Sequence, residues 1–242
     1  MHPGDPAPSG GDANDHRAIF VTYARSGDWT GVHVGQFLSM VAIVAGLVVF
    51  SHALDLRVGG AVAAARVGAV LAVVALALYA VLQAVDGVGN KQVDAAWVHA
   101  SAADRPARFA SAEAVRWLEW GVRSYHEYAL GLALILLGVA AAAVQTAPAP
   151  RAVGWLRVLS GAAYLVQGWV VGAQGFSSAD TTLILVALAL SRTWMVWLAI
   201  IIWREPSQGA DRGTKAPGTG TPARWRLTPC GAGGFTERRR HR

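Results

Sequence analysis

The chain has 242 residues, of which 54% are hydrophobic and only 15% are charged. Soluble domains carry about 25% charged residues, so this composition excludes an ordinary water-soluble globular protein. The single cysteine, Cys230, excludes an internal disulfide and any metal site built from several cysteines.

The first 30 residues contain several prolines and glycines. They lack the basic stretch followed by a short apolar run that is typical of a cleavable signal peptide. We therefore interpret 1–30 as a flexible N-terminal tail.

Five apolar runs follow, each long enough to cross a hydrocarbon core of about 30 Å as a helix. Only helices and closed barrels satisfy the backbone inside lipid, and the alternating segments of a barrel do not occur. We predict an all-α, polytopic membrane helical bundle over 31–204. Its five transmembrane helices are expected at about 34–54, 67–85, 125–144, 156–172 and 182–203.

The long connection at 86–123, between the second and third spans, carries a helix signal of its own. Asp104 precedes Arg105 and Pro106, which is typical of an N-cap followed by proline in the first turn. Charges of alternating sign then recur at spacings of three and four, at Arg116, Glu119, Arg123 and Glu127. This spacing predicts ion pairs on one face of an interfacial helix that precedes the third span, a face that is usually solvated.

A GxxxG motif lies in the fourth span at Gly168 and Gly172. Small residues at this spacing let two helix backbones approach closely in lipid. The motif predicts either a contact within the bundle, which is the simpler interpretation, or a dimer interface.

Basic residues indicate the orientation, because loops rich in Lys and Arg tend to stay in the cytoplasm. On one side they are Arg57, Arg66, Arg151, Arg157 and the tail arginines 224, 226, 238, 239, 240 and 242. We predict a plasma-membrane protein with its N-terminus outside, an extracytoplasmic connection and its C-terminus in the cytoplasm. The connection itself contains Lys91, Arg105 and Arg108, but long connections follow the rule weakly.

The tail at 205–242 is rich in Gly, Pro, Thr and Arg, which is typical of a disordered segment. It also carries much of the net charge of +6. A solvated tail that lies against anionic lipid explains this charge more simply than nucleic-acid binding, so we expect no nucleic-acid partner.

Polar side chains at the edge of the membrane are the main functional signal, because burying one costs several kcal/mol unless it is paired. Seven are expected near the outer side of the bilayer: His33, Gln36, Gln83, Asp86, Glu119, Arg123 and His126. We interpret them as a candidate binding cluster for a small lipid-like amphiphile or a partner subunit. The alternative is a membrane-embedded enzyme that acts on a lipid or isoprenoid, with Asp86 or Glu119 as general acid.

Three of these residues have competing interpretations. Asp86 can simply mark where a helix leaves the bilayer, hydrated or paired with Lys91 or Arg123, or it can be a partly buried proton donor. His33 and His126 start at similar depth, but no close His spacing occurs, so we expect no metal, haem or other cofactor.

Arg192 lies near the middle of the fifth span, where an uncompensated arginine costs about 3 kcal/mol. It should face the bundle and find a partner. We expect either a structural partner such as Gln167 or, as the sharper hypothesis, the anionic group of a ligand. The motifs of common hydrolases, metalloproteases and nucleotide-binding proteins do not occur in the sequence, so no catalytic residue is assigned.

Four segments carry a resemblance to other proteins: GDWTGVHVGQFL (27–38), LQAVDGV (82–88), EAVRWLEWGVRSY (113–125) and QGF (174–176). Together they resemble a group of uncharacterised multi-pass membrane proteins that is common in high-GC actinobacteria. The resemblance covers about 27–204. It implies a helical bundle in the plasma membrane and assigns no activity.

Overall fold

The structure is a computed structural model that describes residues 15–54, 56, 59–144 and 147–204. Within these ranges the regular structure is entirely helical, which confirms the predicted all-α bundle. In chain order the helices are α1 (His16–Arg25), α2 (Trp29–Ala53), α3 (Gly59–Ala84), the π-helical turn η1 (Val85–Asn90), α4 (Lys91–Val98), α5 (Arg105–Val144), α6 (Pro148–Gln174) and α7 (Ser178–Arg204). The predicted basic tail, with Cys230, lies outside the described residues.

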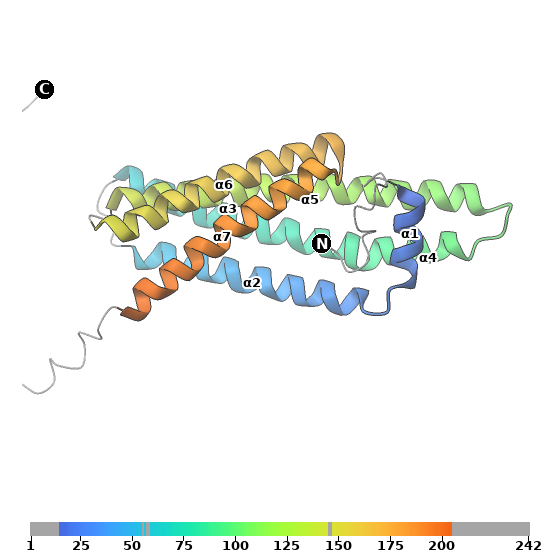
Figure 1. Ribbon diagram of the computed structural model, residues 1–242, viewed down its shortest axis with the longest axis horizontal. Helices are drawn as coiled ribbons and strands as arrows, with labels where there is room; N and C mark the ends of the chain where they lie inside the picture. The colour runs from blue at the N-terminus through green and yellow to red at the C-terminus, as the bar shows by residue number, and fades with distance from the viewer. Residues whose placement is uncertain (1–14, 55, 57–58, 145–146, 205–242) are drawn as a thin grey trace, which may run out of the picture. The chain divides into compact units, whose positions relative to one another are not determined.

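Helix α5 is the centre of the bundle (Figure 1). It packs against α3 and α6, while α2 packs against α3 and α7 packs against α6. Small residues let α3 approach α5, because Ala65, Ala72 and Ala75 are all buried in the core. At Gly68 an added Cβ would lie 2.9 Å from Cγ of Leu137, so a larger residue does not fit there. Close backbone contact therefore holds this pair of helices together.

The GxxxG motif of α6 also faces α5. An added Cβ would lie 2.9 Å from the carbonyl oxygen of Ser124 at Gly168, and 2.9 Å from its Oγ at Gly172. The Ser124 hydroxyl also donates a hydrogen bond of 2.7 Å to the Gly168 carbonyl. The interpretation of this motif as a contact within the bundle is confirmed.

Four helical stretches of the described chain are long and apolar enough to cross a membrane: Trp29–Ala53, Gly59–Val98, Arg105–Val144 and Ser178–Arg204. These stretches identify an integral membrane protein. Helix α6, predicted as the fourth of five spans, has 27 residues but falls outside this set. Arg157, Gln167 and several glycines lower its apolar character.

The predicted connection at 86–123 is mostly helical, with a turn at 99–104 before the expected helix. Helix α3 continues through η1 into α4, and α5 begins at Arg105, so each forms part of an unbroken helical stretch of 40 residues. At 1.5 Å per residue each stretch is about 60 Å long, roughly twice the hydrocarbon thickness of a bilayer. The predicted interfacial helix is therefore the first part of α5, and both helices extend beyond the membrane.

Residues 16–25 were expected to belong to a flexible tail, and this prediction is wrong for them. They form α1, which packs against α4 and lies across that end of the bundle (Figure 1). Ile19, Phe20 and Tyr23 are buried there in a cluster that includes Trp97 and Phe109. Residues 1–14 lie outside the described ranges. We refer to α1, α4 and the first part of α5 as the cap.

Candidate functional site

A cavity of about 700 Å³ lies inside the bundle, next to the cap. Side chains of α2, α3, η1, α5, α6 and α7 line it. Seven of the eight residues proposed from the sequence are among them: Gln36, Gln83, Asp86, Glu119, Arg123, His126 and Arg192. The eighth, His33, contacts Asp86 directly. The structure therefore brings together residues that are spread over more than 150 positions of the sequence.

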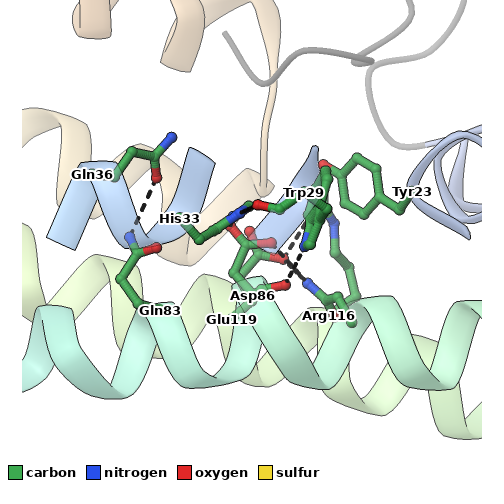
Figure 2. Close-up of polar contacts among 9 residues, drawn as sticks. Tyr23, Trp29, His33, Gln36, Gln83, Asp86, Arg116 and Glu119 are labelled. Atoms are coloured by element: carbon green, nitrogen blue, oxygen red, sulfur yellow. Dashed lines mark hydrogen bonds and ion pairs between the residues drawn. The ribbon is translucent and has the colours of Figure 1, made fainter. Parts of the chain in front are cut away.

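His33 and Asp86 form the buried pair at one wall of the cavity (Figure 2). Nε2 of His33 lies 3.1 Å from Oδ2 of Asp86, and both side chains are almost fully buried. Nδ1 of His33 lies 2.7 Å from the carbonyl oxygen of Trp29. Because a carbonyl only accepts, Nδ1 must carry a proton, so the contact between Nε2 and Oδ2 needs a second proton. The pair is then either an imidazolium with a carboxylate or an imidazole with a carboxylic acid.

The local backbone makes room for this pair. Asp86 lies in the π-helical turn η1, a type of turn that is frequent at functional sites. The indole Nε1 of Trp29 donates a 2.9 Å hydrogen bond to the Asp86 carbonyl oxygen. At Gly87 an added Cβ would lie 2.8 Å from Cβ of His33. A glycine at this position is what allows the imidazole to reach Asp86.

The interpretation of Asp86 as a helix-ending, hydrated carboxylate is wrong, because the helix continues past it and the residue is only 3% exposed. Lys91 is not its partner either. The ammonium of Lys91 donates to the carbonyl oxygens of Tyr23, Ala24 and Ser26 at 2.9, 2.9 and 2.6 Å. All three of its protons are used to hold the end of α1 against the bundle.

A second buried network links the cap to the cavity (Figure 2). Oε2 of Glu119 accepts hydrogen bonds from Nη1 of Arg116 at 2.8 Å and from Nδ2 of Asn90 at 2.7 Å. Nδ2 of Asn90 also lies 3.3 Å from Oδ1 of Asp86. The Arg116 guanidinium reaches the hydroxyl of Tyr23 at 3.2 Å. Asn90 thus connects the two buried carboxylates.

The third pair lies on α5 one turn further along the helix. Nε of Arg123 donates to Oε1 of Glu127 at 3.0 Å, and Nε2 of Gln167 donates to the same oxygen at 2.9 Å. The alternating charges of α5 therefore form ion pairs as predicted, with Glu119 and Glu127 inside the bundle. Their interpretation as a solvated face is wrong. The ring of Phe176 lies under both guanidiniums, 4.5 Å from that of Arg116 and 4.8 Å from that of Arg123.

The two histidines contact different partners within the bundle. Nδ1 of His126 lies 2.9 Å from the carbonyl oxygen of Ala75, and its ring packs against Tyr79. His33 has both ring nitrogens engaged, by Trp29 and Asp86, which leaves neither nitrogen for a haem iron. Among the described residues, no group of three His, Cys, Asp or Glu side chains could hold a metal ion.

Arg192 lines the cavity from α7. The prediction that Gln167 is its partner is wrong, because Gln167 donates to Glu127. Within the part of the chain that the structure describes, no hydrogen bond or ion pair engages the Arg192 guanidinium. The Arg192 side chain is exposed and borders the cavity, so its permanent positive charge can meet the anionic group of a ligand there.

Most charged residues of the cavity lie at the end next to the cap, and Arg192 is the charged residue of its lining furthest along α7. The charged end holds Asp86, Glu119, Glu127 and Asp180 with their basic partners. Further along the same helices, away from the cap, the lining residues are Met40 and Ile43 of α2, Leu130 of α5, and Ile184 and Leu188 of α7. A polar head and an apolar tail are the ligand chemistry that this division matches.

Sequence reasoning missed two residues of the site, Asn90 and Asp180. Asn90 is 1% exposed and Asp180 is 1% exposed, although both lie in segments that the sequence suggested were turns or helix ends. The only sequence signal for Asn90 was its polar side chain four residues after Asp86, and for Asp180 its polar side chain at the start of the fifth apolar run.

Comparison with known proteins finds no match: no family model, curated protein or solved structure matches the chain.

Proposed function

We propose that this integral membrane protein binds a small amphiphile in the cavity next to its cap. The proposal rests on one cavity of about 700 Å³ that combines a buried charged end with apolar walls. Ligand sites are typically concave and mostly apolar, with a few placed polar groups that fix orientation. A polar part of the ligand would lie among Gln36, Gln83 and Arg123, its apolar part along Met40 and Leu188, and an anionic group would reach Arg192 beyond Leu188.

The ligand would carry at least one anionic group. Three basic side chains line the cavity at Arg116, Arg123 and Arg192, and the first two are neutralised by Glu119 and Glu127. Arg192 keeps its charge without an acidic partner among the described residues. An uncompensated guanidinium at this depth is costly, so an anion that reached it from the cavity would be held strongly.

The path of entry would lie between α2 and α7. Both helices line the cavity, but each is held by a different neighbour: α2 packs on α3, and α7 packs on α6. They come together in the core cluster that contains Val44, Leu47 and Trp194, further from the cap. An amphiphile could therefore slide in from the bilayer above this cluster without leaving lipid.

The test is the set of molecules retained by the purified protein, identified by mass spectrometry after gentle detergent extraction. Ser39→Trp would fill the cavity from α2, whereas Leu38→Trp, one position away, changes a side chain that is 60% exposed and lies outside the lining. We expect a retained amphiphile in the natural chain and in Leu38→Trp, and its loss in Ser39→Trp. Equal retention in both variants would refute the proposal, and a co-purifying polypeptide would favour a partner subunit.

A membrane-embedded enzyme is the second candidate, and the His33–Asp86 pair favours it. The pair holds a proton between Nε2 and Oδ2, and Asp86 lines the cavity, so a general acid is in place beside the ligand. This idea predicts that Asp86→Asn abolishes conversion of the retained amphiphile but leaves its binding intact. A ligand recovered chemically unchanged after incubation with the natural protein would argue for binding alone.

The orientation belongs to the same proposal. We place the cap outside the plasma membrane and the other end of the bundle, with Arg66 and Arg151, in the cytoplasm. The plasma membrane as the location is part of the same proposal and rests on the apolar helices, which fit a bilayer. Labelling of a cysteine introduced at exposed Asp104 in intact cells would test it: no reaction with an impermeant maleimide would reverse the orientation.

A further inference from the structure

A second cluster of polar atoms lies in the half of the bundle away from the cap. Arg157 of α6 is 1% exposed, so it is one of the most deeply buried side chains of the described chain. Its guanidinium carbon lies 4.2 Å from the ring centre of Phe50 on α2 and 4.3 Å from that of Trp194 on α7. The sequence suggested a cytoplasmic surface residue here, but the structure places the side chain at the junction of three helices.

Both rings lie against the guanidinium, whose carbon is placed over each of them. Cation–π contacts of this kind stabilise the charge by about 1 to 2 kcal/mol when it is buried. They do not satisfy the N–H groups, which point outward in the plane of the guanidinium. Nε, Nη1 and Nη2 of Arg157 are all buried and find no hydrogen-bond partner within the described ranges.

A fourth donor lies beside them. Nε1 of Trp194 is also buried and has no partner in the part of the chain that the structure describes. Among the described residues, Trp194 belongs to an apolar cluster with Val44, Leu47 and Val153, whose side chains accept no hydrogen bond. The hydroxyls one turn away, on Ser160 and Ser191, bond to each other at 2.7 Å. Four donor nitrogens and a permanent positive charge therefore lack an acceptor among the described residues.

We propose that Arg157 and Trp194 form an anion site that takes a phosphate group. The guanidinium edge matches the spacing of two phosphate oxygens, which is why arginine is favoured in phosphate recognition. The indole N–H supplies a further donor to the same group. This site is separate from the cavity, because neither residue lines it.

The phosphate can come from two sources, and the depth of the site allows both. Arg157 follows the start of α6 at Pro148 by nine positions, or about 13 Å along the helix. A phospholipid headgroup of the adjacent leaflet could reach this depth where α2 and α7 meet, and a free inorganic phosphate could enter from the same end. The common chemistry is a phosphate oxygen on the Arg157 edge.

The experiment measures thermal unfolding of the purified full chain in neutral detergent. Inorganic phosphate and a short-chain phosphatidylglycerol are titrated separately, with sodium chloride to keep ionic strength constant and a diacylglycerol of the same chains as the uncharged control. We expect a saturable rise of the unfolding temperature with at least one phosphate probe. A rise with both probes indicates a free-anion site, and a rise with the lipid alone indicates a lipid site.

Variants tie the response to the site. Arg157→Gln should weaken the apparent affinity at least tenfold, while Arg151→Gln, an exposed arginine on the same helix, should leave it unchanged. Trp194→Phe keeps the ring and removes only the N–H, so it should weaken the affinity several-fold. It also decides the matter if Arg157→Gln does not fold.

Two results would overturn the proposal. One is a natural chain that shows no saturable response to either phosphate probe, or the same response in Arg157→Gln and Trp194→Phe as in the natural chain. The other concerns Asp55, which follows Phe50 by five positions and lies outside the described residues. If Asp55→Asn lowers the unfolding temperature as much as Arg157→Gln and the probes have no effect, the guanidinium pairs within the chain.

Discussion

Replacement of Gly87 by alanine is a direct test of the His33–Asp86 pair. The new Cβ would lie 2.8 Å from Cβ of His33, closer than real Cβ atoms come to their neighbours, and 3.0 Å from its Cγ, which is also a tight contact. The imidazole must therefore move, and its contacts with Asp86 and with the Trp29 carbonyl must lengthen. Overpacking of a buried site costs typically about 1 to 3 kcal/mol of the free energy of unfolding.

Gly89 supplies the matched control, since it lies in the same π-helical turn. An alanine Cβ there would be 3.4 Å from Cγ1 of Val115, an ordinary contact. Alanine is more favourable than glycine in a helix by up to about 1 kcal/mol, and this gain applies to both variants. The difference between Gly87→Ala and Gly89→Ala therefore isolates the steric effect, which we expect to be about 1 to 3 kcal/mol.

The assay is equilibrium unfolding in mixed micelles, followed by circular dichroism for both variants and the natural chain. Gly87→Ala should unfold at lower denaturant than Gly89→Ala. In the natural chain and in Gly89→Ala, His33 should also give the downfield N–H proton resonance of an imidazole bonded to a carboxylate. Equal stability of the two variants, or an unchanged resonance in Gly87→Ala, would refute this account of the pair.

Two further predictions concern the centre of the bundle. Glu119→Gln leaves a buried guanidinium without its counter-charge, so it should lower the free energy of unfolding by about 3 to 5 kcal/mol. Glu113→Gln, which removes a partly exposed partner of a histidine, should cost under about 1 kcal/mol. Similar losses for the two variants in denaturant unfolding would contradict the burial of the first pair. Gly168→Ala should destabilise the bundle by about 1 to 3 kcal/mol because its Cβ would meet the backbone of α5, whereas Gly121→Ala has open space. Light scattering should give the same mass for Gly168→Ala as for the natural chain. A change of mass would instead support the interpretation of the motif as a dimer interface.

The helices of the bundle were largely predictable from the sequence because burial in lipid imposes a simple rule. An apolar run of about 20 residues must form a helix, since no water is present to satisfy its backbone. The cap was not predictable in this way. Helix α1 has a polar average composition and is stable because Phe20 and Tyr23 find a surface on α4 and α5. No local pattern in 16–25 shows that such a surface exists.

The sequence predicted which residues belong to the candidate site better than it predicted which of them contact one another. The expectation that polar residues at the edge of a membrane gather together placed Asp86 and Glu119 on one side, and both line the cavity. Partners were a different matter: Asp86 contacts His33 and not Lys91, and Gln167 contacts Glu127 and not Arg192. Charge and spacing describe what a side chain can bind, but they do not rank partners that lie far apart in the chain.

The sequence by itself determined the solvent of this protein, the helical class of its fold and the i to i+3 and i to i+4 ion pairs of α5. Each of these follows from composition or from neighbours along one helix, where the geometry is fixed in advance. Only the tertiary structure decided that η1 continues the helix past Asp86, that Lys91 holds the end of α1, and that Arg157 lies between two aromatic rings. Those outcomes depend on which surfaces meet when the helices pack, and packing joins residues whose separation in the sequence carries no information about their distance in space.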